Sequence, residues 1–140
     1  MVVVLALALT AGSCRSETAG GPAEPGTTVV LAGEPVPVSR LTAAVDGLCT
    51  ALRQAPANPK AAEATFFDES HATLHVVARA LEDVDRPAAA ALLEAKQQVE
   101  ADFSAGLASG GRVSDDLRRL VDATRAGLTR LEVPTQACDK

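Results

Sequence analysis

Four long stretches of this chain repeat their apolar residues every three or four positions, and this pattern constrains the fold more than any other feature. A period near 3.6 residues is typical of an amphipathic α-helix that buries one face. Alanine and leucine supply most of the apolar residues, while aromatic residues make up only 2% and tryptophan and tyrosine are absent. Such a composition suits closely packed helices and disfavours a β-sandwich, which relies on β-branched and aromatic residues. We therefore predict an all-α domain.

The predicted helices have recognisable ends and short connections. They span about residues 39–55, 59–84, 86–104 and 114–131. Each begins at or just after a residue that commonly caps a helix N-terminus: Ser39, Asn58, Asp85 and Ser114. Glycines at 106, 110 and 111 mark the longest connection as a linker. Because short connections favour antiparallel neighbours, we predict an up-down-up-down four-helix bundle over residues 39–140.

The first fourteen residues have the pattern of an export signal. An apolar run from Val2 to Leu9 is followed by three small residues, Ala-Gly-Ser, and then by Cys14. A run of this length is typical of a signal peptide. It is shorter than the ~20 apolar residues that a membrane-crossing helix needs.

The segment before Cys14 resembles the lipobox of bacterial lipoproteins, in which a small residue such as Ser13 directly precedes the cysteine. The resemblance implies that residues 1–13 are a signal peptide that is removed, and that Cys14 is acylated with fatty acids such as palmitate. Ala11 stands where that family usually has leucine, and no Lys or Arg precedes the apolar run. We expect a protein of the cell envelope, held by lipid to the outer face of the membrane. The alternative is ordinary signal cleavage at residues 11–13, which would give a secreted protein.

Residues 14–38 are predicted to be a flexible tether between the lipidated cysteine and the bundle. Residues 15–28 are rich in Gly, Pro, Ser, Thr and Glu and contain no large apolar side chain, so burial cannot offset the entropy cost of ordering them. Residues 29–38 regain apolar side chains, but Pro35 and Pro37 exclude a helix interior and disfavour a central strand. We expect this second part to run extended against the domain.

The three cysteines are an odd number, which needs an explanation in an exported protein. With Cys14 assigned to lipid, Cys49 and Cys138 remain as a disulfide pair, and disulfides persist outside the cytoplasm. In an up-down-up-down bundle the last helix ends near the start of the first, so the tail 132–138 could run back along the first helix to Cys49. The alternative is two free thiols.

A possible metal site lies on the second predicted helix. Steps of 100° per residue would place Asp68, His71 and His75 within about 60° of one another on one side of that helix. Two imidazoles at i and i+4 can share a divalent metal ion, and a carboxylate can complete a Zn-, Cu- or Ni-type site. The alternative is that His71 lies at the edge of the core beside an exposed His75 and an exposed Asp68.

Other cofactor classes are disfavoured. Three carboxylates on the third predicted helix, Glu94, Glu100 and Asp102, are predicted to point away from its apolar stripe, and no Glu-x-x-His motif of a di-iron bundle accompanies them. Both histidines lie one turn apart on the same helix, so they cannot bracket a haem. We expect no cofactor apart from the possible divalent metal.

The charge and the motifs point to binding and not to catalysis. A net charge of −5 and a pI near 5.0 argue against nucleic acid as a partner, because its binding needs a basic face. Acidic and basic residues interleave along the fourth predicted helix, which indicates a solvated surface. No triad, nucleophile elbow, P-loop or dinucleotide-binding turn is present, so we expect no enzyme. The sequence thus predicts an extracytoplasmic lipoprotein with a non-catalytic binding or scaffolding bundle that takes an envelope protein or a small ligand. The alternative is an envelope metal-binding protein.

Overall fold

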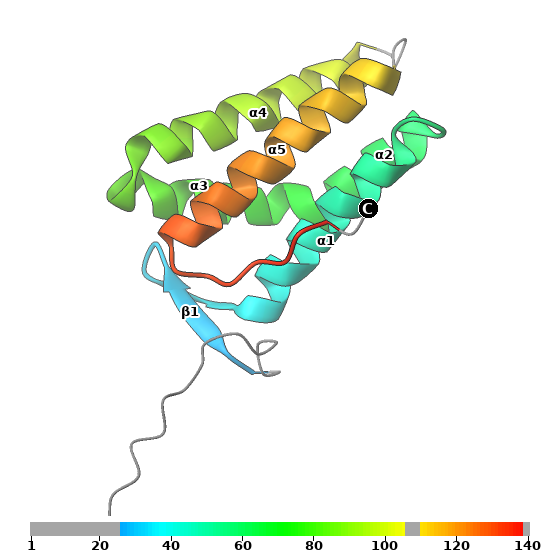
Figure 1. The fold of residues 1–140 in the computed structure, drawn as a ribbon. Coiled ribbons are helices and arrows are strands. Elements are labelled where there is room, and N and C mark those ends of the chain that lie inside the picture. Colours follow the sequence, from blue (N-terminus) through cyan, green and yellow to red (C-terminus); the bar gives the residue numbers. More distant parts are fainter. Residues whose placement is uncertain (1–25, 106–109, 139–140) are drawn as a thin grey trace, which may run out of the picture.

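All four predicted helical segments form in the computed structural model, which describes residues 26–105 and 110–138 (Figure 1). The helices are α1 (Val38–Gln54), α2 (Pro59–Thr65), η1 (Phe66–His71), α3 (Ala72–Val84), α4 (Arg86–Ser104) and α5 (Gly110–Arg130). The predicted all-α class is therefore supported, with a small two-stranded sheet as an addition. The predicted signal peptide 1–13, Cys14 and the tether up to residue 25 lie outside the described residues.

The core is formed by the apolar stripes of the helices, as the sequence pattern predicts. The long helix α5 lies beside α4 and runs in the opposite direction (Figure 1), while α1 packs against α2, η1 and α5. The largest fully buried side chains come from α1, η1, α3, α4 and α5: Leu41, Leu48, Phe66, Leu74, Leu81, Leu92, Leu117, Leu120 and Leu128. None of the helices among the described residues is long and apolar enough to cross a membrane.

Two of the four predicted helix caps are confirmed. The Asn58 side chain accepts a hydrogen bond from the Ala61 N–H at 3.1 Å, and the Asp85 side chain accepts one from the Ala88 N–H at 3.0 Å. Each cap is followed within two residues by a proline, whose missing N–H costs nothing in the first turn.

The caps predicted at Ser39 and Ser114 are wrong, and packing explains both cases. Helix α1 already begins at Val38, whose N–H donates to the Thr27 carbonyl at 2.9 Å, so the preceding segment satisfies this helix end. Helix α5 begins at Gly110, which leaves Ser114 inside the helix and turns part of the predicted glycine linker into helix. Val113 is 1% exposed and extends the apolar stripe of α5 by a turn, and this burial favours the earlier start.

The last part of the predicted tether runs extended against the domain, as expected, and in addition forms a hairpin. Strands β1 (Thr28–Leu31) and β2 (Glu34–Pro37) pair antiparallel through a two-residue turn at Ala32 and Gly33, both with positive φ. Leu31 and Val36 are buried against the helices. A two-stranded sheet has only edge strands, so the prolines of β2 are tolerated where a central strand would exclude them.

The helix predicted over 59–84 is interrupted by the π-helical turn η1. One line of buried positions recurs every four residues, at Ala62, Phe66, Ser70, Leu74 and Ala78, and α3 buries further residues such as Val77 and Leu81. In an ideal α-helix that spacing would rotate the stripe by about 40° per step, and a wide π turn removes this drift. As a result Phe66 is completely buried, whereas the neighbouring Phe67 is 43% exposed.

Close packing of α1 holds the π turn in place. The Ser70 hydroxyl is buried and donates to the Ala44 carbonyl at 2.8 Å. Gly47 allows this approach, because a Cβ at that position would lie 2.6 Å from Ser70 Oγ and 2.7 Å from Glu69 Cβ. The π turn is therefore a packed element of the fold and not a frayed helix end.

The C-terminal tail agrees with the predicted staple. After α5 the chain turns back and runs along α1 (Figure 1), with Val133 only 3% exposed. The sulfur atoms of Cys49 and Cys138 lie at disulfide distance, and their Cα atoms are 5.3 Å apart. The tail thus closes one side of the core next to α1.

Candidate functional site

The structure brings together only two members of the predicted metal triad. The rings of His71 and His75 lie 4.9 Å apart between centroids, at an interplanar angle of 83°. Asp68 is exposed and lies inside the π turn, where the 100° step behind the prediction does not hold. Within residues 26–105 and 110–138, no group of three or more His, Cys, Asp and Glu side chains is placed to hold a metal ion.

The partners of the histidine pair come from α4. Glu100 Oε1 lies 2.7 Å from His71 Nε2 and also accepts a hydrogen bond from Lys96 Nζ at 2.7 Å. The Lys96 side chain is only 5% exposed, so its ammonium group is fixed inside the bundle. We call His71, His75, Lys96 and Glu100 the histidine cluster. A metal ion there would compete with a buried cation for the same carboxylate, so this geometry does not favour the metal hypothesis, which stays a prediction from the sequence.

The electrostatics of the histidine cluster favour a neutral His75 beside an ionised Glu100. Burial lowers the pKa of His75 from its ordinary 6.5, the charges of Lys96 and His71 lower it further, and Glu100 opposes them. Burial acts to raise the pKa of Glu100, but the hydrogen bonds and charges of Lys96 and His71 outweigh it, so this pKa lies below its ordinary 4.5. The cluster therefore presents an uncharged imidazole at neutral pH.

The exposed Phe67 extends this cluster into a small aromatic surface. The Phe67 ring centroid lies 5.2 Å from that of His71, 5.0 Å from that of Phe66 and 6.3 Å from that of Phe103. Offset and edge-on rings at such distances attract one another. We call Phe67, His71 and His75 the aromatic face. It combines one large exposed apolar ring with two polar rings, a combination suited to binding a partner.

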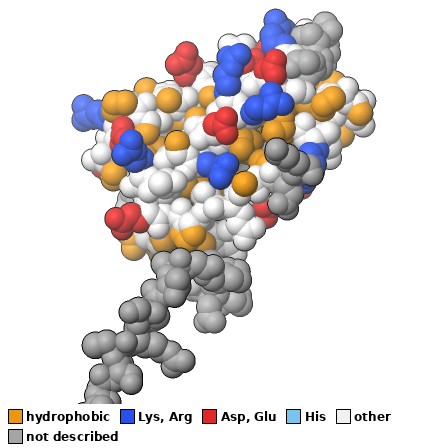
Figure 2. Space-filling model, in the orientation of Figure 1, with side chains coloured by type: hydrophobic (Ala, Val, Ile, Leu, Met, Phe, Trp, Pro, Cys, Tyr) orange, Lys and Arg blue, Asp and Glu red, His pale blue; other side chains and the backbone are white. Residues whose placement is uncertain are grey.

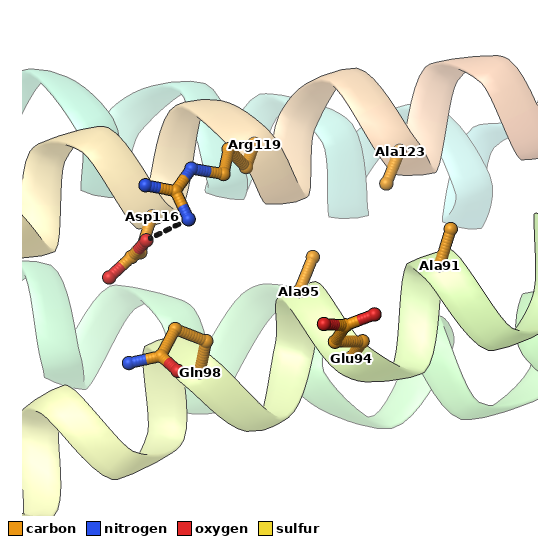
Figure 3. A pocket seen from close by; sticks show the side chains of 7 residues that line it. All are labelled: Ala91, Glu94, Ala95, Gln98, Asp116, Arg119 and Ala123. Carbon is orange, nitrogen blue, oxygen red and sulfur yellow. Dashed lines mark ion pairs between the residues drawn. The ribbon is translucent and has the colours of Figure 1, made fainter.

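A hollow lies between α4 and α5 and has a volume of about 360 Å³. Figure 3 shows that alanines leave room between the two helices, while polar side chains from both helices flank the gap. The lining residues are Ala91, Glu94, Ala95, Gln98, Asp116, Arg119 and Ala123. Arg119 forms an ion pair with Asp116 at 3.1 Å. We call this hollow the α4–α5 groove.

Sequence reasoning missed the buried carboxyls beside this groove. Asp102 is 4% exposed and Asp116 is 3% exposed, although Asp102 is predicted to point away from the stripe and the charges of the last helix to form a solvated surface. Their burial could have been predicted from helical spacing, since Asp102 and Asp116 follow the buried Val99 and Val113 by three residues. The remaining charges of α5 fit the prediction better. Basic, acidic and apolar side chains are interspersed on the face shown in Figure 2, and Arg118 pairs with Asp115 at 2.9 Å.

Comparisons of this chain with protein-family models, with curated proteins and with solved structures give no match.

Proposed function

We propose that this protein is a membrane-anchored, extracytoplasmic lipoprotein whose helical domain binds a protein partner in the cell envelope without catalysing a reaction. The lipobox-like segment before Cys14 supports the anchor. The pairing of Cys49 with Cys138 supports an oxidising compartment, because such bonds are rare in the cytoplasm.

We also propose that the helices form an antiparallel up-down-up-down bundle, with α2, η1 and α3 acting together as its second member. In support, the chain reverses direction between successive members in Figure 1. The connections between the first three members are short, and the tail returns along α1, as this topology requires.

The single observation that carries the binding function is the aromatic face on the π turn and the first turn of α3. Inserted π turns inside α-helices are frequent at functional sites. Here the turn buries Phe66 and leaves Phe67 43% exposed beside His71. Aromatic side chains are enriched at the centres of protein interfaces, because they bury a large area at low entropy cost. A neutral His75 extends the surface without adding a charge that a partner would have to desolvate.

Site-specific photo-crosslinking tests this function in cells that make the full chain. Phe67 is replaced by a photoreactive phenylalanine analogue, which keeps the aromatic ring. Matched controls carry the analogue at Val84, 61% exposed at the end of α3, and at Arg118, whose side chain is 59% exposed on α5. We expect one discrete adduct from position 67 and none from the controls. No adduct at 67, or equal adducts at all three positions, would contradict binding through the aromatic face.

A further inference from the structure

Two buried carboxyl groups meet across the interface of α4 and α5, next to the groove. Asp102 on α4 and Asp116 on α5 are both buried, and a hydrogen bond with the Asp102 side chain is among the causes that raise the pKa of Asp116. Each also has an arginine from α5: Arg112 Nε lies 3.0 Å from Asp102 Oδ1, and an Arg119 guanidinium nitrogen lies 3.1 Å from Asp116 Oδ1. The carboxyl pair is thus only partly compensated by positive charge from side chains that are themselves mostly exposed.

The second oxygen of Asp102 has no donor among the described side chains and backbone groups. Arg112 approaches Oδ1, and Gln98 Nε2 also donates to Oδ1 at 3.4 Å, but Oδ2 is buried and without a hydrogen-bond partner. A buried oxygen left in this state has lost its hydration without gaining a hydrogen bond, and the penalty is larger if it carries charge. A proton on the neighbouring Asp116 carboxyl would supply the missing donor.

We propose that Asp102 and Asp116 share one proton, with the Asp116 hydroxyl donating to Asp102 Oδ2, and that this bond is a pH-sensitive clasp between α4 and α5. The geometry assigns the acceptor to Asp102, because its Oδ1 already receives both Arg112 and Gln98. Two adjacent buried carboxyls resist losing both protons, as in other acid pairs.

The electrostatics around Asp116 agree with this assignment. Burial raises the pKa of Asp116 most, and the hydrogen bond to Asp102 raises it next. The charge of Asp102 also raises it, while the charges of Arg119 and Arg112 lower it. The net direction is upward from the ordinary value of 3.8. Glu94 adds a further carboxylate to the wall of the α4–α5 groove.

The direction of the pH effect follows from the raised pKa of Asp116. Between pH 3.8 and the raised value, the folded chain binds this proton more than the unfolded chain does, so its contribution to stability decreases as pH rises. Loss of the proton places two negative charges in a buried interface and adds one negative charge to the groove wall. The clasp is therefore closed in acid and loosened at higher pH.

The test begins with a ¹³C titration of the aspartate carboxyl carbons in the full chain. We expect the carboxyl carbon of Asp116 to titrate with a midpoint above 3.8. An Asp116 midpoint at or below 3.8 would overturn the proposal, and this measurement needs no variant.

Two matched variants then test the clasp itself. Asp116→Asn keeps a donor for Asp102 Oδ2 but has no proton to lose. Relative to this variant, the wild type should therefore lose stability as pH rises above 3.8. At pH values above the Asp116 midpoint, amide hydrogen exchange in the first turns of α5, corrected for intrinsic rates, should become faster in the wild type but not in Asp116→Asn. Asp115→Asn, at the exposed neighbouring position, should keep the wild-type profile. An Asp116→Asn chain as pH-dependent as the wild type would overturn the proposal.

Discussion

Lys96 shows how single residues shape this domain, because a lysine buried to this extent must have a partner. Its Nζ reaches Glu100 at 2.7 Å, and the same oxygen lies 2.7 Å from His71 Nε2. Glu100 is 28% exposed, so water still solvates its carboxylate. The buried ammonium group of Lys96, in contrast, depends on Glu100 for compensation of its charge. The two partners of this ion pair should therefore respond differently to removal.

We predict that Glu100→Gln destabilises the fold and that Lys96→Met does not. Glu100→Gln leaves a buried ammonium group without its counter-charge, which should cost about 1–3 kcal/mol after allowance for the exposure of Glu100. Lys96→Met replaces the buried charge with an apolar side chain of similar length, and such changes are often neutral or stabilising. Urea unfolding at pH 7 measures both. An equal loss for the two variants would contradict the asymmetry.

The ion pair of Lys96 and Glu100 should also affect how the stability of the protein depends on pH in acid. A depressed carboxylate pKa contributes stability above the unfolded value of 4.5, and this is lost as pH falls through the folded value. The wild type should therefore lose more stability below pH 4.5 than Glu100→Gln, so the two curves converge in acid. Parallel curves would show that Glu100 has no such role.

Gly47→Ala should destabilise the domain by about 1–2 kcal/mol. The added methyl would lie 2.7 Å from Glu69 Cβ and 2.6 Å from Ser70 Oγ, so α1 and the π turn must separate. Overpacking of this kind costs about 1–3 kcal/mol, and the better helix propensity of alanine offsets up to about 1 kcal/mol. Gly127→Ala is the matched control, because its methyl would meet the flexible end of Leu81. Urea unfolding should show a larger loss of unfolding free energy for Gly47→Ala than for Gly127→Ala. The reverse order would contradict this prediction.

At the scale of elements, the sequence predicts those helix ends that depend on neighbouring residues alone. Asn58 and Asp85 cap the helices that follow them, as predicted. These helix starts are predictable because a proline follows each capping residue closely, in the first turn. The start of α5 at Gly110 was not predictable in this way, since it depends on burial of Val113 against other helices. The hairpin was missed because Ala32 occupies a positive-φ turn position that usually carries Gly or Asn.

The candidate site was less predictable than the fold. The sequence singles out His71 and His75, and the structure does place their rings together. Their partner Glu100 lies 29 residues from His71, on a helix whose rotation depends on tertiary packing. The π turn is not predictable from the sequence either, because it depends on a tertiary contact between Ser70 and α1.

The C-terminal tail is the element with the largest predicted effect on stability. The cysteines are separated by 89 residues, and closing so long a loop contributes about 4 to 5 kcal/mol in the chain-entropy model. We predict that Cys138→Ala lowers the free energy of unfolding by about 2–4 kcal/mol, which is the typical contribution of a disulfide. Denaturant unfolding of oxidised and reduced wild type, with Ala137→Ser as a neighbouring control, measures this. Equal midpoints for oxidised and reduced wild type would rule out a stabilising staple.

At the scale of the whole molecule, three features divide the domain into regions with different roles. The tail and its disulfide close the core beside α1, the aromatic face lies on η1 and α3, and the carboxyl pair joins α4 to α5. The proposed binding through the aromatic face and the proposed pH response of the clasp should therefore be separable by mutation. Their place in the cell depends on the lipid anchor proposed at Cys14.

Intact mass spectrometry of the native protein from its own membranes tests the anchor most directly. We expect a mature chain that begins at Cys14 and carries the added mass of fatty acyl groups. Cys14→Ser should lose that mass and leave the membrane fraction, whereas Ser16→Ala, two residues further on, should behave as the wild type. A chain that retains residues 1–13, or a Cys14 without fatty acid, would contradict the lipid anchor and the location that depends on it.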